Sequence, residues 1–254
     1  MNSMKLESEI ERIVIDTVEE LKRPDLFRRP FAGFSSAEDK RYTDLKTLIG
    51  DWHQTPAELL PGAVSVISYC VPFTKEVVSE PKTVQGGSPL WAEAYQEINK
   101  QFDVINENIA RFLEGAGYSA KTIRATHTYD PRDMKAMWSH RSAAAIAGLG
   151  SFGANRLLIT KKGSGVRFCT VITTAPLEAN TKTFESKCLY LKNGSCGLCF
   201  RICPVKALEP DSMDKFSCQD ELNRNGARLR EATELQNTDT CGKCISICPV
   251  AYIE

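Results

Sequence analysis

Apolar side chains recur at helical spacing near the start of the chain. Within residues 5–22 they return every three or four positions, at Ile10, Ile13, Val14, Val18 and Leu21. This spacing predicts one amphipathic helix, and Pro24 ends it because proline cannot continue a helix. Residues 23–36 show no period and are expected to form a loop.

The pattern becomes strand-like between residues 63 and 71. The sequence AVSVISYCV follows Pro61 and Gly62, is rich in β-branched residues and predicts a buried strand. Further helices are expected around residues 38–50, 89–115 and 133–147, and further strands at 121–126, 156–160 and 166–173. The last two strands are expected to pair around the turn KKGSG, and residues 74–88 to form a polar loop.

Regular periodicity fades after residue 186, where eight of the ten cysteines lie. We therefore expect a domain boundary near residues 177–186. An α+β domain would occupy residues 1–183, and a small cysteine-rich domain would occupy residues 184–254. The overall composition, 42% hydrophobic and 25% charged, is typical of a globular protein.

Charge and hydropathy exclude several classes of protein. The 32 basic residues are balanced by 32 acidic ones, so the basic excess typical of nucleic-acid-binding proteins is absent. The N-terminal segment has no uninterrupted apolar stretch, and no segment reaches 18 apolar residues. We therefore expect a cytoplasmic protein without membrane contact. Cysteines in such a protein indicate metal or redox chemistry, because structural disulfides are rare in the cytosol.

The eight late cysteines form two similar groups. The first is Cys188-x7-Cys196-x2-Cys199-x3-Cys203-Pro204, and the second is Cys218-x22-Cys241-x2-Cys244-x3-Cys248-Pro249. Both end in C-x2-C-x3-C-P, which is typical of bacterial ferredoxins that hold iron–sulfur clusters. Eight thiolates are the number that two [4Fe–4S] clusters require.

In bacterial ferredoxins the cysteine before the proline binds the other cluster, so the two groups interlock. By this rule one cluster takes Cys188, Cys196, Cys199 and Cys248, and the other takes Cys203, Cys218, Cys241 and Cys244. The usual spacing would put a cysteine where this chain has Asn193. Either Cys188 reaches in from five residues earlier, or that cluster keeps three thiolates. A zinc site is the alternative, because two C-x2-C pairs can also bind zinc.

Two cysteines lie outside these groups. Cys70 and Cys169 each stand alone in an apolar, strand-like run. We expect both to be buried as small hydrophobic residues.

A glycine-rich segment, Gly148-Leu-Gly150-Ser-Phe-Gly153, matches the pattern G-x-G-x-x-G. A dinucleotide-binding fingerprint requires a strand before this pattern and a helix after it. Here a predicted helix precedes it and a predicted strand follows, so NAD binding is rejected as the first interpretation. The glycines mark either a plain helix–strand turn or a loop that lies against a large flat cofactor.

Several stretches together resemble a known family. The segment SHRSAAAIAGLGSFGANRLLIT, followed by GSGVRFCTVITTAPL, the two cysteine groups and KFSCQDEL between them, resembles the epoxyqueuosine reductase family. It looks most like the short relatives of that enzyme among double-cluster 4Fe–4S proteins. The family loop usually reads AGLGWIGKN, and here it reads AGLGSFGAN. Reductive dehalogenases are more distant kin. The resemblance covers roughly residues 120–254 well and the earlier residues only in outline.

The resemblance implies an α+β, nitroreductase-like domain that binds cobalamin, followed by a small bacterial-ferredoxin-type domain with two [4Fe–4S] clusters. In the family, electrons pass through the clusters to cobalamin, whose low-valent cobalt reduces the substrate. The glycine loop would lie against the corrin. Its candidate cofactor-binding residues, with one from the following strand, are Gly148, Gly150, Gly153, Asn155 and Arg167.

Two residues are candidates for a catalytic proton donor. Asp133 precedes the predicted helix and could instead cap it. His140 titrates near neutrality but could instead be a packed helix residue. The family's acidic donor lies in a D-T-x-P element, and the sequence YDPRD at 129–133 does not match it in register.

Three functions compete. The favoured one is a cobalamin-dependent reductase that takes electrons from a low-potential ferredoxin or flavodoxin and acts on a small molecule or a corrinoid protein. The alternative is a ferredoxin-type electron carrier that reduces a partner without a catalytic site of its own. The roughly 185 residues before the clusters exceed what a carrier needs. A tRNA substrate is not expected, because the helical repeats that help longer family members bind tRNA do not follow Glu254.

Overall fold

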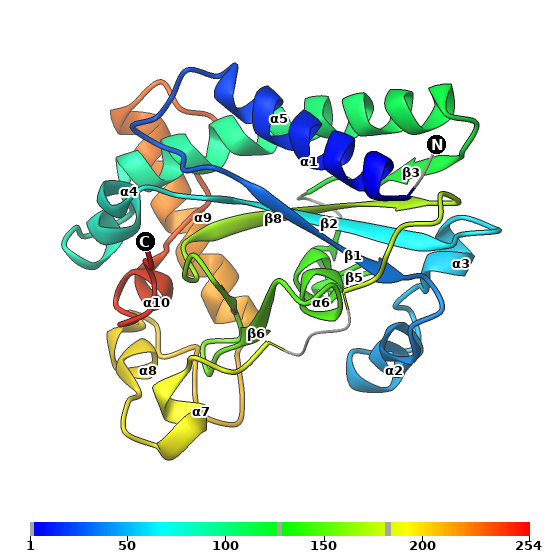
Figure 1. Cartoon of the computed structure of the whole chain (residues 1–254). Coiled ribbons are helices and arrows are strands. Elements are labelled where there is room, and N and C mark those ends of the chain that lie inside the picture. The colour runs from blue at the N-terminus through cyan, green and yellow to red at the C-terminus, as the bar shows by residue number, and fades with distance from the viewer. Residues whose placement is uncertain (1–2, 126–128, 181–183) are drawn as a thin grey trace.

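The centre of the protein is an antiparallel sheet of four strands. A computed structural model describes residues 3–125, 129–180 and 184–254 (Figure 1). The strand order is β1-β2-β8-β3. The strands are β1 (Phe31–Ser36), β2 (Ser65–Pro72), β8 (Val166–Thr173) and β3 (Ala120–Thr122). All eight residues of β2 are buried, so both faces of the sheet must be covered.

Two long helices cover one face of this sheet (Figure 1). Helix α1 (Ser3–Glu19) buries three residues of the predicted apolar stripe, Ile10, Val14 and Val18, and it also buries Leu6. Ile13 and Leu21 of that stripe are partly buried against the same core. Helix α5 (Pro89–Gly115) has the predicted bounds and begins where the Ser88 hydroxyl accepts a hydrogen bond from the Trp91 amide. Together with β2 and β8, these helices enclose the largest apolar core.

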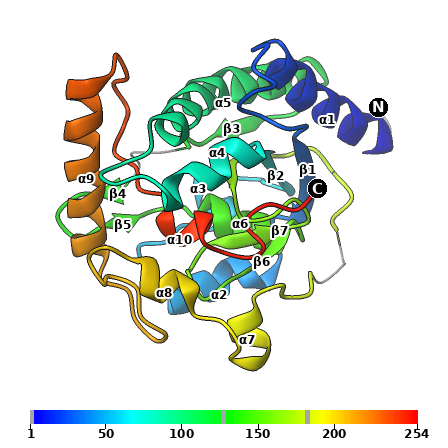
Figure 2. The ribbon, with the colours of Figure 1, turned by 90° about the vertical axis from the view of Figure 1, so that its left-hand side faces the viewer.

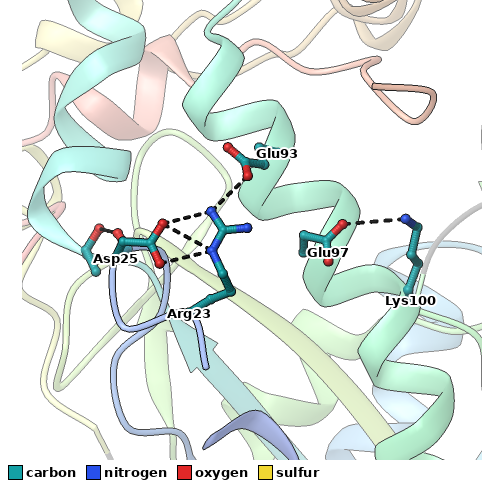
Figure 3. Close-up of polar contacts among 6 residues, drawn as sticks. Arg23, Asp25, Glu93, Glu97 and Lys100 are labelled. Carbon is teal, nitrogen blue, oxygen red and sulfur yellow. Dashed lines mark hydrogen bonds and ion pairs between the residues drawn. The ribbon is translucent and has the colours of Figure 1, made fainter. Parts of the chain in front are cut away.

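An arginine in the loop after α1 ties that loop to α5. The Arg23 guanidinium lies 2.7 Å from an Asp25 carboxylate oxygen and 2.8 Å from one of Glu93 (Figure 3). One turn farther along α5, Lys100 and Glu97 form a looser pair at 3.5 Å. The ion pair of Arg23 with Glu93 therefore ties the loop to α5 before the chain enters β1.

The other face of the sheet is covered by shorter elements (Figures 1 and 2). Helix α6 packs on β8 and β2, and α2 packs on α6. The elements of this layer are α2 (Lys40–Leu48), α3 (Pro56–Leu59), α6 (His140–Ile146), β6 (Gly150–Phe152) and β7 (Leu158–Thr160). The mixed helix and strand content agrees with the expected α+β class.

The cysteine-rich region wraps around one end of the sheet (Figure 2). Its helices are α7 (Leu189–Asn193), α8 (Leu198–Ile202), α9 (Lys215–Ala232) and α10 (Lys243–Ser246). Helix α10 docks on α4 (Lys75–Ser79) and the 3-10 helix η1 (Glu80–Lys82). The Lys243 ammonium donates to the carbonyls of Pro81 and Val84 at 2.9 and 2.5 Å. These contacts join the cysteine-rich region closely to the rest of the protein. The domain boundary expected near residues 177–186 stays a prediction.

Some expected elements were wrong. Residues 31–36 form edge strand β1 instead of a loop, because β2 offers them a complete hydrogen-bonding partner. Residues 75–82 form α4 and η1 instead of a polar loop. The strand expected at 121–126 ends at Thr122, and residue 126 lies outside the described residues.

The helix expected from residue 133 begins only at His140. Residues 129–136 form instead a small hairpin of β4 (Tyr129–Asp130) and β5 (Lys135–Ala136). The hairpin turn contains Met134 in the left-handed region, with φ of 56°, which a helix could not accommodate.

The expected pairing of residues 156–160 with 166–173 was also wrong. Strand β7 pairs with β6. Strand β8 pairs along its whole length with β2, and β3 pairs with residues 171–173 on its other edge. The turn between β7 and β8 contributes only an isolated bridge between Thr160 and Gly163. No helix of the described residues is long and apolar enough to cross a bilayer.

Candidate functional site

Four thiols surround a partly open hollow at the end of the molecule that holds α7 and α8. The hollow has an empty volume of about 390 Å³, and its lining includes Cys188, Cys196, Cys199 and Cys248. Burial, together with the neighbouring thiols of Cys188, Cys199 and Cys196, raises the pKa of Cys248 to about 11. The four sulfurs therefore face one another across the same space.

The other four late cysteines lie together beside it. Burial, together with the neighbouring Cys241 and Cys203, raises the pKa of Cys218 to about 11. Burial, together with the neighbouring Cys241, Cys218, Cys199 and Cys203, raises the pKa of Cys244 to about 12. Cys199 thus links the two sets.

The structure brings the eight thiols together in the two interlocked sets that the spacing predicts. Cys248, from the end of the second sequence group, lies with the first set, and Cys203 lies with the second. Their role as cluster ligands stays a prediction. Among the described residues, no three His, Cys, Asp or Glu side chains converge tightly enough to hold a single metal ion.

The path of the chain explains how Cys188 takes the place of the missing cysteine at position 193. Helix α7 begins directly after Cys188 and ends at Gly194, whose φ of 73° reverses the chain. This single turn carries Asn193 past the hollow and leaves Cys188 inside it, 9% exposed. The amide of Ala154 donates to the Cys188 sulfur at 3.4 Å.

Both C-x2-C loops use glycine at the same place. Gly197 and Gly242 directly follow the first cysteine of each loop, with φ of 127° and 72°. A residue with a Cβ rarely adopts these values, so glycine lets each loop bend around its thiols. A second backbone amide, that of Ala207, donates to a cysteine sulfur, that of Cys203 at 3.3 Å.

The glycine motif serves mainly the packing of β6 against β7. Gly148 ends α6 with φ of 72°, and a Cβ on Gly150 would collide with the Ile159 carbonyl. These observations favour the plain-turn interpretation for Gly148 and Gly150. Asn155 lines the first hollow and donates from its amide to the Cys244 carbonyl at 3.1 Å. It therefore bridges the two thiol sets.

A second and larger hollow opens between α2, α6 and the glycine segment. Its empty volume is about 980 Å³. Four of its lining residues are large apolar side chains exposed to solvent: Leu48, Ile49, Phe152 and Leu191. Gly153 also lines it, which keeps the prediction that this loop contacts a cofactor open. Contiguous exposed apolar surface of this kind marks a binding site.

Arg141 and Arg156 also line this second hollow, and no acidic residue does. The guanidinium of Arg141 donates to the Arg156 carbonyl at 3.3 Å. Burial lowers the pKa of Arg141, although the side chain is exposed to solvent. Burial and exposure are compatible here, because the Arg141 side chain lies deep in the protein but faces the second hollow. Sequence patterns did not single out either arginine.

Arg167 lies on the other face of β8 from the glycine segment. Residues alternate along β8, so Phe168 packs with Leu149 of the glycine segment while Cys169 faces α5. Arg167 follows the second direction: it donates to the Asn99 side chain at 3.0 Å and stacks on Tyr95 at 4.4 Å. These contacts with α5 do not support the predicted position of Arg167 beside the glycine loop.

His140 belongs to a hydrogen-bonded network that uses both ring nitrogens. Nε2 donates to the Arg124 carbonyl at 2.9 Å, because a carbonyl can only accept. Nδ1 lies 2.8 Å from the Thr170 hydroxyl, which also accepts from the Trp138 indole at 2.8 Å. Burial lowers the pKa of His140 to about 4. The network favours the packed alternative, and the catalytic role stays untested.

Asp133 lies on the exposed hairpin between β4 and β5. It pairs with Lys135 at 3.2 Å and caps no helix, because the Ser139 hydroxyl caps α6. Neither the predicted donor role nor a contact with the hollows follows from this position. The chain has two histidines besides His140. His53 is buried and stacks on Trp138, and His127 lies outside the described residues.

Cys70 and Cys169 are fully buried, as predicted. Cys70 packs in the apolar cluster under the glycine segment. Cys169 accepts a hydrogen bond from the Asn106 amide at 3.3 Å.

Comparisons with known proteins agree with this architecture. No protein-family model matches the chain, and no curated protein matches its sequence. Solved structures of epoxyqueuosine reductase do match: that from Streptococcus thermophilus has a TM-score of 0.58 and 18% identity over 98% of this chain and 65% of its own. That from Bacillus subtilis has a TM-score of 0.55 and 20% identity, covering 95% of this chain and 66% of its own.

A structure described as a reductive dehalogenase with a mechanism for B12-dependent dehalogenation matches with a TM-score of 0.58 and 17% identity. This match covers 86% of the present chain and 29% of the dehalogenase. The chain thus spans just under two thirds of the epoxyqueuosine reductases and less than one third of the dehalogenase. At these identities the likeness concerns the fold, and the chain has the fold shared by epoxyqueuosine reductases and B12-dependent reductive dehalogenases.

Proposed function

We propose that this chain is a cobalamin-dependent reductase that carries two [4Fe–4S] clusters. The observation that carries the proposal is the pair of interlocked four-thiol sets, next to a large apolar hollow, in a fold shared with cobalamin-dependent reductases. A low-potential ferredoxin or flavodoxin would supply the electrons.

The thiol sets fit clusters better than zinc. A tetrahedral zinc site draws its sulfurs to about 2.3 Å from one point, whereas these thiols surround a hollow. Glycine loops and amides aimed at Cys188 and Cys203 suit a cluster, because hydrogen bonds to sulfur tune its potential. The first cluster would take Cys188, Cys196, Cys199 and Cys248, and the second Cys203, Cys218, Cys241 and Cys244.

The second hollow fits a corrin. A corrin is large and flat, and the exposed apolar side chains of Leu48, Phe152 and Leu191 offer it surface to bury. Leu191 lies on the short helix that starts at Cys188, so this site adjoins the first thiol set. When bound, the corrinoid would supply low-valent cobalt as the reductant. The protein's own part is to bind it, exclude water and hold the clusters nearby.

The thiol assignment is tested by counting iron and labile sulfide after anaerobic reconstitution. The unaltered protein should hold about eight irons, and C188A or C203A should each lose one cluster while the other keeps its EPR signal. C70A is the matched control, since Cys70 is buried away from both sets. Zinc at full occupancy without iron, or loss of both clusters in every variant, would contradict the assignment.

The corrinoid site is tested by titrating cob(II)alamin into the cluster-loaded protein and recording the cobalt EPR spectrum. Saturable binding near one equivalent with a changed spectrum supports the reductase. An unchanged cobalt spectrum beside intact cluster signals rejects it and leaves the electron carrier.

The substrate is proposed to be a small molecule or a corrinoid protein. One matching structure is of an epoxyqueuosine reductase with a tRNA stem loop, so an epoxyqueuosine-containing stem loop belongs among the first substrates tested.

A further inference from the structure

The second hollow combines an apolar rim with unbalanced positive charge. Arg141 and Arg156 line it, and none of its lining residues is acidic. Within the part of the chain that the structure describes, neither guanidinium has a carboxylate partner: Arg141 donates to a carbonyl of Arg156, and Arg156 donates to the carbonyl of Pro210 at 2.7 Å. Among the described residues, six other arginines pair with Asp or Glu, as Arg132 does with Asp130.

A third arginine, which does not line the hollow and extends toward α5, adds positive charge near Arg141. Arg167 lies near enough to Arg141 to lower its pKa by like-charge repulsion. Arg167 has no carboxylate partner among the described residues either, and its Nε is buried without a hydrogen-bond acceptor. Like charges held close without counter-charge destabilise a protein, and they are retained where an anion completes the site.

The cluster thiolates supply part of the missing negative charge. Cys244 lies near enough to Arg141 to stabilise its charge. The guanidinium makes no hydrogen bond to any thiol, however, and it is exposed to the hollow. Its remaining N–H groups are therefore available to a ligand, and a planar guanidinium suits the oxygens of a carboxylate or phosphate.

We propose that Arg141 and Arg156 form an anion-binding site in the second hollow, which takes a phosphate or carboxylate group attached to an apolar body. Two sources fit this chemistry: an anionic substrate, or the phosphodiester in the nucleotide tail of a corrinoid. The inference deepens the proposed function, and its first measurement does not depend on it.

The first measurement is calorimetric titration of inorganic phosphate into the protein as purified, without added corrinoid. We expect saturable binding at one site that weakens at least about tenfold in R141Q and in R156Q, the loss typical of one charged hydrogen bond. R132Q is the matched control, because Arg132 is an exposed arginine already paired with Asp130, and it should bind phosphate as the unaltered protein does.

The second measurement identifies the source by comparing cob(II)alamin with cob(II)inamide, which lacks the nucleotide tail and its phosphodiester. If Arg141 holds the tail, the preference for cobalamin over cobinamide falls at least about tenfold in R141Q. If the anion belongs to the substrate, this preference is unchanged in R141Q while phosphate binding is lost.

Each result bears on one claim. Phosphate binding that is absent or equal in all variants, together with an unchanged corrinoid preference, overturns the anion site. Phosphate binding that needs Arg141 in a protein that binds neither corrinoid supports the anion site and rejects the proposed function.

Discussion

Arg28 holds the C-terminal end of the chain against the sheet. Its guanidinium donates to three carbonyls from distant segments: Phe73 at 2.9 Å, Ile253 at 2.6 Å and Lys162 at 2.7 Å. It also stacks on the Tyr252 ring at 4.2 Å. Ile253 lies five residues after Cys248, so this contact fixes the tail that carries one of the eight thiols.

Replacing Arg28 with alanine should destabilise the protein by about 3 kcal/mol. Each hydrogen bond from a charged donor contributes about 1.5–3 kcal/mol, so three would give at least about 4.5 kcal/mol. In the native protein the guanidinium has lost part of its hydration, and this burial lowers its pKa. The alanine variant no longer bears that desolvation cost, which offsets roughly a third of the loss. For a chain of this size the result corresponds to a fall in Tm of about 6–12 °C.

The assay is denaturation of the reduced, cluster-free protein by guanidinium chloride, followed by tryptophan fluorescence. R28A should lower the midpoint without changing the slope. R28K should fall between R28A and the unaltered protein, because one ammonium cannot reach all three carbonyls. R29A is the matched control, since its neighbour Arg29 is exposed and should change stability by less than about 0.5 kcal/mol.

A loss below about 1 kcal/mol in R28A, or equal losses in R28A and R29A, would refute this reasoning. After reconstitution, R28A should also hold less iron, because Cys248 is no longer fixed beside its three partners. Iron content equal to that of the unaltered protein would separate the stability effect from the cluster.

Three further predictions follow from single sites. G163A should lose more than about 1 kcal/mol, because Gly163 has a φ of +100° and its Cβ would collide with the Ala251 carbonyl; G115A has open space and should lose none in the same denaturation assay. Glu58 has a pKa of about 2, lowered first by its hydrogen bond from Lys46. Its stabilising effect is present above pH 4.5 and is lost as the pH falls through 2, and carboxyl NMR of K46M should show the pKa raised. His140 should stay neutral by imidazole NMR down to about pH 4, so stability falls as the pH drops below 6.5; titration near 6.5 would contradict the network.

The sequence predicted the long helices well because their signals are local. The apolar stripe of α1 and the span of α5 depend on residues three or four positions apart, and no distant partner changes that spacing. Spacing also predicted which thiols come together. The rule that the cysteine before proline joins the other set puts Cys248 and Cys203 where the structure has them.

The short strands were less predictable because their partners are distant. The sequence of residues 31–36 has no strand pattern, and these residues form an edge strand because β2 lies beside them. The same holds for β7, whose partner is β6 and not the neighbouring strand β8 that the sequence predicted. A helix satisfies its hydrogen bonds within itself, whereas a strand depends on which segment reaches it.

The sequence by itself determined the α+β class, the two long helices and the grouping of eight thiols, since these rest on composition and short spacings. Only the tertiary structure decided that Arg167 faces α5 and that His140 is hydrogen-bonded to Arg124 and Thr170. The same is true of Arg141, which lines a hollow that has no carboxylate in its lining. These facts depend on which side chains from distant segments come into contact, and such contacts cannot be predicted from residue type and spacing along the chain.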